Sequence, residues 1–306
     1  MDTFNNSEYK LLISSLLNDT QYIKISNMGK IAGLRKHAEV LVRKILNIGN
    51  NQKIMLGQIK NNSDNSAVKK GLNELGDDLS NELIKIIKII NPLGIDGTHT
   101  QHTADFSKQE VDSIEDAILD LYALLFIKYF TNIEISIYVE PQTLHIFSLL
   151  PPIIRYKTWN YLFNKDQNNI QVVNKLCLSI IKVFDKNIAY KWLEDNSKII
   201  KAIPYPNADD IKKYKSINTF EIMPGLYRMS VSLDFDSYNN MYDLLYDKIN
   251  DTRTSINEAG KMYKNFEEAI DYYNRVIIEY RNILDKDFLD LMEFVYIGRK
   301  SVEELK

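Results

Sequence analysis

Amphipathic periodicity between Ser107 and Phe130 constrains this chain more than any other stretch of its sequence. Ser107 and Glu110 have the spacing of a capping box, in which each side chain accepts a hydrogen bond from the other residue's unpaired backbone N–H. Apolar residues then recur at alternating steps of three and four, as on one face of an α-helix; they are Val111, Ile114, Ile118, Leu121 and Leu125. The pattern predicts a helix over 108–130 that buries one face.

The segments before this helix have the same periodicity and predict a helical bundle. The predicted helices lie at 8–17, 22–47, 52–59 and 72–90. In the second of them the apolar positions are Ile31, Leu34, Ala38, Leu41 and Ile45. Pro92 is expected to end the last one at Asn91, since the residue before a proline disfavours helix. Together with 108–130, these helices predict a mainly α domain over residues 1–131.

The pattern changes after Phe130 and predicts a second domain over residues 132–306. Residues Ile133–Val139 alternate apolar and polar side chains, which indicates a strand. Helices are then predicted at 152–163, 170–184 and 188–200. Pro224-Gly225 is expected to turn a β-hairpin whose arms are Phe220–Met223 and a half-buried strand, Leu226–Phe235. The second domain is therefore predicted to be helical α+β.

A long C-terminal helix is predicted over residues 256–284, where apolar and aromatic residues keep the three-four spacing of a bundle or coiled-coil helix. They are Ile256, Ala259, Tyr263, Phe266, Ile270, Tyr273, Ile277, Tyr280 and Leu284. The tyrosines in this stripe are interpreted as core residues. Either the segment near 238–249 or a second copy of the chain must cover the stripe, and a homo-oligomer is expected.

Composition indicates a globular protein with an ample core. Hydrophobic residues make up 45% of the chain, charged residues 26%, and the net charge is −3. This balance disfavours a globally basic nucleic-acid-binding protein. The one cysteine, Cys177, lies in an apolar run and is expected to be a buried thiol in a reducing compartment. With no signal peptide and no apolar run near the roughly 20 residues that span a bilayer, a cytoplasmic protein is expected.

The loop before Ser107 holds the best candidates for chemistry, His99 and His102. Asp96 and Asp105 flank them, so the residue types suit a transition metal, but no third or fourth ligand stands at a recognisable spacing. Neither a metal nor a cofactor is predicted. Two interpretations stay open. The imidazoles either buttress the loop, or act as an acid/base pair or a phosphate contact ahead of a helix N-terminus.

A second set of candidates lies on the predicted helix 22–47 and consists of Arg35, Lys36, Arg43 and Lys44. Such a charge run is commonly a solvated helix face. The alternative is a nucleic-acid-binding surface. If this helix packs beside 108–130, Arg35 and Arg43 would reach a phosphate held near His99 and His102.

Several enzyme classes are excluded by missing motifs. The sequence contains no glycine-rich phosphate loop, no G-x-G-x-x-G after a strand and no G-x-S-x-G turn. Asp234 and Asp236 follow a predicted strand and are interpreted as turn residues rather than metal ligands. Nucleotide hydrolysis and serine-hydrolase chemistry are therefore not expected from the known motifs.

The region from about residue 20 to 130 resembles the helical HEPN superfamily, in particular its branch associated with restriction systems. The resemblance rests on GLRKHAEVLVRKIL, with Gly33, Arg35 and Ala38, and on the loop and capped helix that contain Gly97, His99 and Ser107. It implies a helical bundle. Many members of the superfamily are ribonucleases or toxins of phage defence.

Those ribonucleases carry an arginine four to six residues before a histidine, and this chain lacks that spacing. The resemblance therefore favours a non-catalytic binding and dimerisation protein of a prokaryotic phage-defence or mobile-element system. Its expected partner is RNA or another nucleic acid, or a protein from the same operon. The alternative is a HEPN-type ribonuclease with a displaced site formed by Arg35 or Arg43 with His99 and His102.

Overall fold

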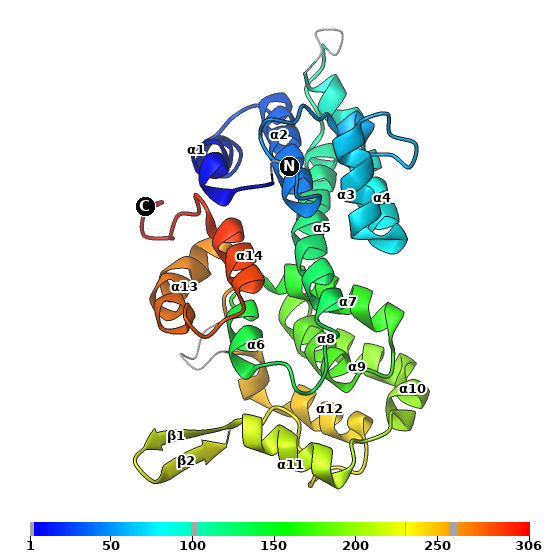
Figure 1. Ribbon diagram of the computed structural model, residues 1–306, viewed down its shortest axis with the longest axis vertical. Helices are drawn as coiled ribbons and strands as arrows, with labels where there is room; N and C mark the ends of the chain where they lie inside the picture. Colours follow the sequence, from blue (N-terminus) through cyan, green and yellow to red (C-terminus); the bar gives the residue numbers. More distant parts are fainter. Residues whose placement is uncertain (1–2, 99–102, 230, 257–261) are drawn as a thin grey trace. The chain divides into compact units, whose positions relative to one another are not determined.

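A computed structural model describes residues 3–98, 103–229, 231–256 and 262–306, which are mainly α-helical with a single β-hairpin (Figure 1). This confirms the predicted fold class. The chain forms two compact units. Unit 1 comprises Met1–Tyr129 and Lys286–Lys306, and unit 2 comprises Phe130–Asp285. Unit 1 is thus built from two segments far apart in sequence, whereas the division predicted at residue 131 leaves each domain continuous.

The helices of unit 1 follow the predicted periodicity. They are α1 (Asn6–Leu17), α2 (Asn27–Ile45), α3 (Ser66–Leu75), α4 (Asp77–Asp96), α5 (Lys108–Asn132, whose last three residues belong to unit 2) and α14 (Lys286–Tyr296). A π-helical turn covers Asn18–Tyr22. The helix predicted at 52–59 is a single 3-10 turn, Leu56–Gln58. The apolar positions predicted on α2 are all buried, with at most 1% of each side chain exposed.

The capping box at the start of α5 is confirmed. The backbone N–H of Ser107 donates to Glu110 Oε2 at 2.8 Å, and the backbone N–H of Glu110 donates to Ser107 Oγ at 3.3 Å. The five apolar positions predicted on this helix are buried. The local signal therefore fixed both where α5 begins and which face it buries.

The prediction that helix α4 ends at Asn91 is wrong. The helix continues through Pro92 to Asp96. Proline removes one backbone donor, but the last turn gains other bonds. The N–H of Gly97 donates to Leu93 O at 2.9 Å, and Thr98 Oγ1 donates to Gly94 O at 3.0 Å. These contacts stabilise the turn beyond the proline.

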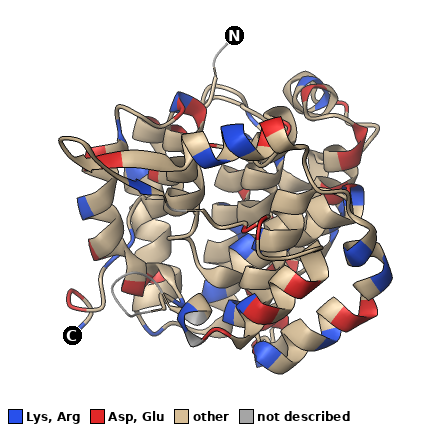
Figure 2. Ribbon diagram, turned by 90° about the horizontal axis from the view of Figure 1, so that it is seen from below, with Lys and Arg blue, Asp and Glu red and all other residues tan. Residues whose placement is uncertain are grey.

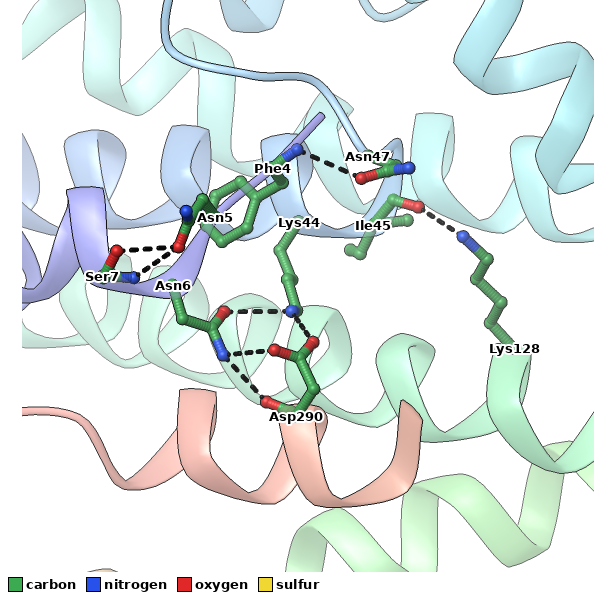
Figure 3. Close-up of polar contacts among 9 residues, drawn as sticks. All are labelled: Phe4, Asn5, Asn6, Ser7, Lys44, Ile45, Asn47, Lys128 and Asp290. Atoms are coloured by element: carbon green, nitrogen blue, oxygen red, sulfur yellow. Dashed lines mark hydrogen bonds and ion pairs between the residues drawn. The ribbon is translucent and has the colours of Figure 1, made fainter. Parts of the chain in front are cut away.

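Helix α14 returns to unit 1 and completes its core. Phe288 is fully buried, with its ring 6.3 Å from that of Phe126 and 5.2 Å from that of Tyr129. At the next turn Asp290 forms an ion pair with Lys44 of α2, and its backbone carbonyl accepts a hydrogen bond from Asn6 Nδ2 at 3.0 Å (Figure 3). Helix α14 therefore contacts helices from the beginning of the chain.

Unit 2 is a set of helices followed by the hairpin. It contains α6 (Pro141–Phe147), α7 (Pro152–Lys165), α8 (Ile170–Val183), α9 (Lys186–Asp195), α10 (Ser197–Ala202), α11 (Ala208–Ile217), β1 (Thr219–Met223), β2 (Leu226–Met229), α12 (Met241–Asn250), a 3-10 turn (Thr252–Ser255) and α13 (Phe266–Tyr280). Helix α8 packs against α7, α9 and α12, and it holds Cys177, which is fully buried as predicted.

The strand predicted at Ile133–Val139 is absent, and these residues form turns. Ile135 and Ile137 are buried as the alternation requires, but no described strand lies beside them to form a ladder. The hydroxyl of Ser136 instead accepts a hydrogen bond from the N–H of Tyr138 at 3.2 Å. A period of two can therefore mark an irregular segment that buries alternate residues.

The predicted hairpin is present, but its second arm is shorter than expected. β1 and β2 pair antiparallel across Pro224-Gly225, and Gly225 has φ +77°, a conformation that glycine adopts without strain. β2 ends at Met229, and Leu233 and Phe235 are buried outside any strand. Both strands are exposed along their whole length, so the prediction of a half-buried second arm is wrong.

The long helix predicted over 256–284 is shorter, since α13 covers Phe266–Tyr280 and residues 262–265 are not helical. Ala259 lies outside the described residues. Phe266, Ile270, Tyr273 and Ile277 are buried within the chain, and α13 packs against α6. The apolar stripe on α13 is therefore covered intramolecularly, and its tyrosine at 273 is a core residue.

Replacing Phe288 with alanine should lower the free energy of unfolding by about 3–5 kcal/mol, because it leaves a cavity against Phe126 and Tyr129. Val302→Ala, in the exposed part of the same C-terminal segment, is the matched control and should change stability by no more than about 0.5 kcal/mol. Urea unfolding followed by circular dichroism measures both. Equal effects of the two substitutions would contradict the docking of α14 into the core of unit 1.

Candidate functional site

Arg35 lies where the sequence places a candidate site, at the end of α4. Its aliphatic stem packs on Gly94, where an added Cβ would come within 2.4 Å of Arg35 Cδ. Its Nη1 donates to Thr98 Oγ1 at 3.3 Å. Because Thr98 directly precedes His99, the guanidinium group is held at the start of the candidate loop. His99 and His102 themselves lie outside the described residues.

Lys36 is exposed on the same helix, and one carboxylate accompanies the cations. Glu39 is half-buried, and burial raises its pKa, although Arg43, Arg35 and Lys36 each act to lower it. The positive charge of α2 is therefore partly offset by an acidic side chain on the helix itself.

Arg43 has a structural role in the loop after α2. The side chain is buried, Nη1 donates to Gly49 O at 2.8 Å, and Nη2 donates to Gln52 O at 2.9 Å. These bonds hold the backbone of the loop after the helix. A phosphate contact would have to compete with them.

Lys44 is likewise engaged. Its Nζ forms an ion pair with Asp290 and donates to Asn6 Oδ1 at 3.0 Å (Figure 3). Only 9% of its side chain is exposed. In this position Lys44 joins α1, α2 and α14, and it has little surface left for a ligand.

The structure thus separates the four cations of α2 that the sequence groups together. Arg35 and Arg43 are eight residues apart, which places them about 12 Å apart along the helix axis. Arg35 lies beside Thr98, whereas Arg43 and Lys44 are bonded at the C-terminal end of α2. In this arrangement Arg35 and Arg43 are engaged at different ends of α2.

His37, which lies outside the candidate loop, forms a buried polar chain with two later residues. Tyr122 Oη lies 3.0 Å from His37 Nε2 and accepts a hydrogen bond from Arg299 Nη2 at 3.1 Å. A hydrogen bond therefore joins Tyr122 Oη and His37 Nε2, and the tautomer of the imidazole decides which of the two donates. Nδ1 has no partner among the described residues. These hydrogen bonds link α2, α5 and the segment after α14 within unit 1.

This environment keeps His37 neutral. Burial, followed by the positive charge of Arg299, lowers the pKa of His37 to about 3. A neutral imidazole with no accessible surface is suited to fixing the core rather than to exchanging protons with a substrate.

Sequence reasoning missed the exposure of the β1–β2 hairpin, which carries a cluster of large apolar side chains. Their exposed fractions lie between 49% and 64%; the residues are Phe220, Ile222, Met223, Leu226, Tyr227 and Met229. In the ladder Phe220 lies opposite Arg228, and the adjacent pair is Glu221 with Tyr227. Because successive ladder positions face opposite sides, both faces of the hairpin present apolar groups to solvent. The sequence could have indicated this exposure. A hairpin with one buried face needs apolar residues only at alternate positions, and these two strands carry more than that.

Charged residues of both signs are distributed along the helices. In the view of Figure 2, lysine and arginine segments occur together with aspartate and glutamate segments. Among the described residues, no group of three or more histidine, cysteine, aspartate or glutamate side chains could hold a metal ion. The search of the same residues for a helix of membrane-spanning length and hydropathy also found none.

The neutral state of His37 predicts a pH dependence of stability. From pH 6.5 down towards its folded pKa of about 3, the unfolded chain binds a proton at His37 that the folded chain does not. Stability from this residue is thus complete above pH 6.5 and falls by about 1.4 kcal/mol per unit as the pH decreases. His37→Gln, which keeps a neutral polar group, should remove this slope in urea unfolding between about pH 6 and about pH 4. Parallel profiles for wild type and variant would contradict a buried neutral imidazole.

Comparison of the chain with protein-family models, curated proteins and solved structures yields no match. The resemblance to the HEPN superfamily therefore rests on the motifs around Arg35 and the loop before Ser107 alone and stays a prediction. The geometry of the described residues is what remains to argue function from.

Proposed function

We propose that this chain is a non-catalytic binding and dimerisation protein that docks through the β1–β2 hairpin. The observation that carries the proposal is the exposure of six large apolar side chains on nine strand residues. Single exposed apolar residues are ordinary on protein surfaces, but a contiguous group commonly marks an interface. Figure 1 shows the hairpin extending from the end of α11 as an arm.

The partner we favour is a second copy of the chain. An isolated two-stranded hairpin is marginally stable in water, and three or more strands are needed for a stable sheet. Both outer edges of this hairpin carry unpaired backbone groups, which can template pairing with another strand. Two copies joined edge to edge would form four strands. The strands carry one acidic and one basic residue, Glu221 and Arg228, so approach of identical arms meets no net repulsion.

A protein partner fits the hairpin better than a nucleic acid does. Affinity for nucleic acid comes largely from cations that contact phosphates. Arg228 is the one cation on the two strands, and Arg43 and Lys44 on α2 are already bonded within unit 1. The HEPN resemblance suggests the biological setting, a prokaryotic phage-defence or mobile-element system, with a protein from the same operon as a further partner.

The test is the oligomeric state of a hairpin variant. Ile222→Glu with Tyr227→Glu adds like charges to the arm and should weaken dimerisation by at least about tenfold, since each interface apolar group typically contributes on the order of 1–2 kcal/mol. Ile278→Glu on α13, where the side chain is 72% exposed, is the control and should dimerise like wild type. Sedimentation equilibrium over a concentration series measures the dissociation constants. A wild-type chain that stays monomeric at high micromolar concentration would contradict the proposal.

One observation favours the alternative, a HEPN-type ribonuclease with a displaced site. Arg35 packs on Gly94 and donates to Thr98, the residue that directly precedes His99 in sequence. In this alternative the arginine binds the phosphate of RNA while a histidine of the candidate loop moves a proton. Arg43 could take part in this alternative only by giving up its hydrogen bonds to the loop after α2.

Incubation of the purified protein with total RNA in the presence of EDTA separates the two functions. The binding proposal predicts no cleavage by wild type. Metal-independent cleavage that is lost in His99→Ala/His102→Ala and in Arg35→Ala, but retained in the exposed neighbour Lys36→Ala, would establish the ribonuclease instead.

A further inference from the structure

Three lysines of unit 2 come together without a carboxylate. Lys175 and Lys182 are seven residues apart on α8, so they lie on the same face two turns apart. Lys248 lies on α12, which packs against α8. All three side chains are half-buried, and no salt bridge among the described residues includes any of them.

A buried hydrogen-bond donor lies beside the lysines without an acceptor. Lys248 Nζ donates to Asn174 Oδ1 at 2.5 Å and to the backbone carbonyl of Ser232. Asn174 is fully buried, and its Nδ2 has no partner among the described residues. A buried amide N–H without an acceptor costs about 1–3 kcal/mol, so the group is expected to meet an acceptor in the functional protein.

The lysines repel one another. Burial, followed by neighbouring positive charges, lowers the pKa of Lys175 to about 8 and that of Lys182 and Lys248 to about 7. The charges are those of Arg155 of α7, which acts on Lys175 and Lys182, and of Lys175, which acts on the other two lysines. No acidic side chain of the described residues is among the groups that act on them. The fold therefore brings basic groups together without a described carboxylate that would keep them charged.

We infer that Lys175, Lys182 and Lys248, with Nδ2 of Asn174, form a binding site for a small phosphate-bearing anion. Each group is a hydrogen-bond donor, and a phosphate offers several acceptor oxygens with close to two negative charges at neutral pH. One such ligand would relieve the repulsion among the lysines and supply the acceptor that Asn174 lacks. Arg155, whose Nε donates to Leu150 O at 2.9 Å, would add long-range attraction without leaving its own contacts.

The partial burial of the lysines favours a compact ligand over a nucleic-acid backbone. An extended polyanion needs cations spread along an open surface, whereas these three lysines are half-buried and Lys248 contacts the fully buried Asn174. The site lies on α8 and α12, apart in sequence from the β1–β2 hairpin. The inference therefore goes beyond the proposed dimerisation and does not depend on it.

Isothermal titration of the full chain with inorganic phosphate, pyrophosphate and ATP tests the site. Lys175→Met/Lys182→Met keeps the aliphatic stems and should weaken binding of the preferred anion at least about tenfold. Lys191→Met/Lys198→Met removes the same number of charges from exposed positions of unit 2 and should bind like wild type. Comparison of the three anions shows whether the site prefers a free phosphate or a nucleotide.

A second variant keeps the test informative if the methionine substitutions disturb folding. Asn174→Asp is nearly isosteric and places a carboxylate next to Lys248, where it would replace the external anion. This variant should bind phosphate at least about tenfold more weakly and, in phosphate-free buffer, have a melting temperature no lower than that of wild type. Equal binding by the lysine variant and its control, wild-type affinity in Asn174→Asp, or no binding of any of the three anions by wild type would overturn the inference.

Discussion

The packing of Phe288 against Phe126 and Tyr129 fixes the architecture of unit 1, because it brings the end of the chain back to the unit built by its beginning. Closing so long a loop costs only a few kcal/mol of chain entropy, since that cost grows with the logarithm of loop length. Burial of one large aromatic side chain recovers much of it. The polar contacts of Lys44 with Asp290 then fix the register of α14.

The return of α14 to unit 1 is a non-local contact, whereas the sequence patterns report local structure. Helical periodicity is a local property, so the buried positions of α2, the start of α5 and the apolar stripe of α13 could be predicted from spacing alone. The absence of the strand expected at Ile133–Val139 could not be predicted, because a strand requires a partner and the spacing does not reveal whether one is present. Pairing of α14 with α5 is equally non-local and carries no motif.

The same limit applies to the candidate site. Arg35 contacts Thr98, the residue before His99, because Gly94 leaves room for its stem. Arg43 and Lys44 have the same charge, but their use depends on a loop carbonyl and on Asp290, which no spacing rule identifies. The sequence position of a cationic residue indicates which face of the helix it occupies. Whether its side chain is available to a ligand depends on the hydrogen bonds and ion pairs that it makes within the fold.

Burial of apolar side chains closes unit 1, but the apolar side chains of the hairpin stay exposed within the single chain. Phe130, Phe147 and Trp159 of unit 2, for example, form a cluster in which all three aromatic side chains are buried. On the hairpin, by contrast, Phe220 and Tyr227 remain about half exposed or more. We propose that an interface covers this arm and that a separate, charged ligand binds at the lysines of α8 and α12.

Hydrogen–deuterium exchange of the hairpin amides tests the central claim most directly. The unpaired edges of β1 and β2 exchange quickly in a monomer and become protected when another copy pairs with them. The account predicts that exchange over 219–229 slows as protein concentration rises, while exchange in α13 stays constant. Fast exchange of the hairpin at every concentration would contradict it.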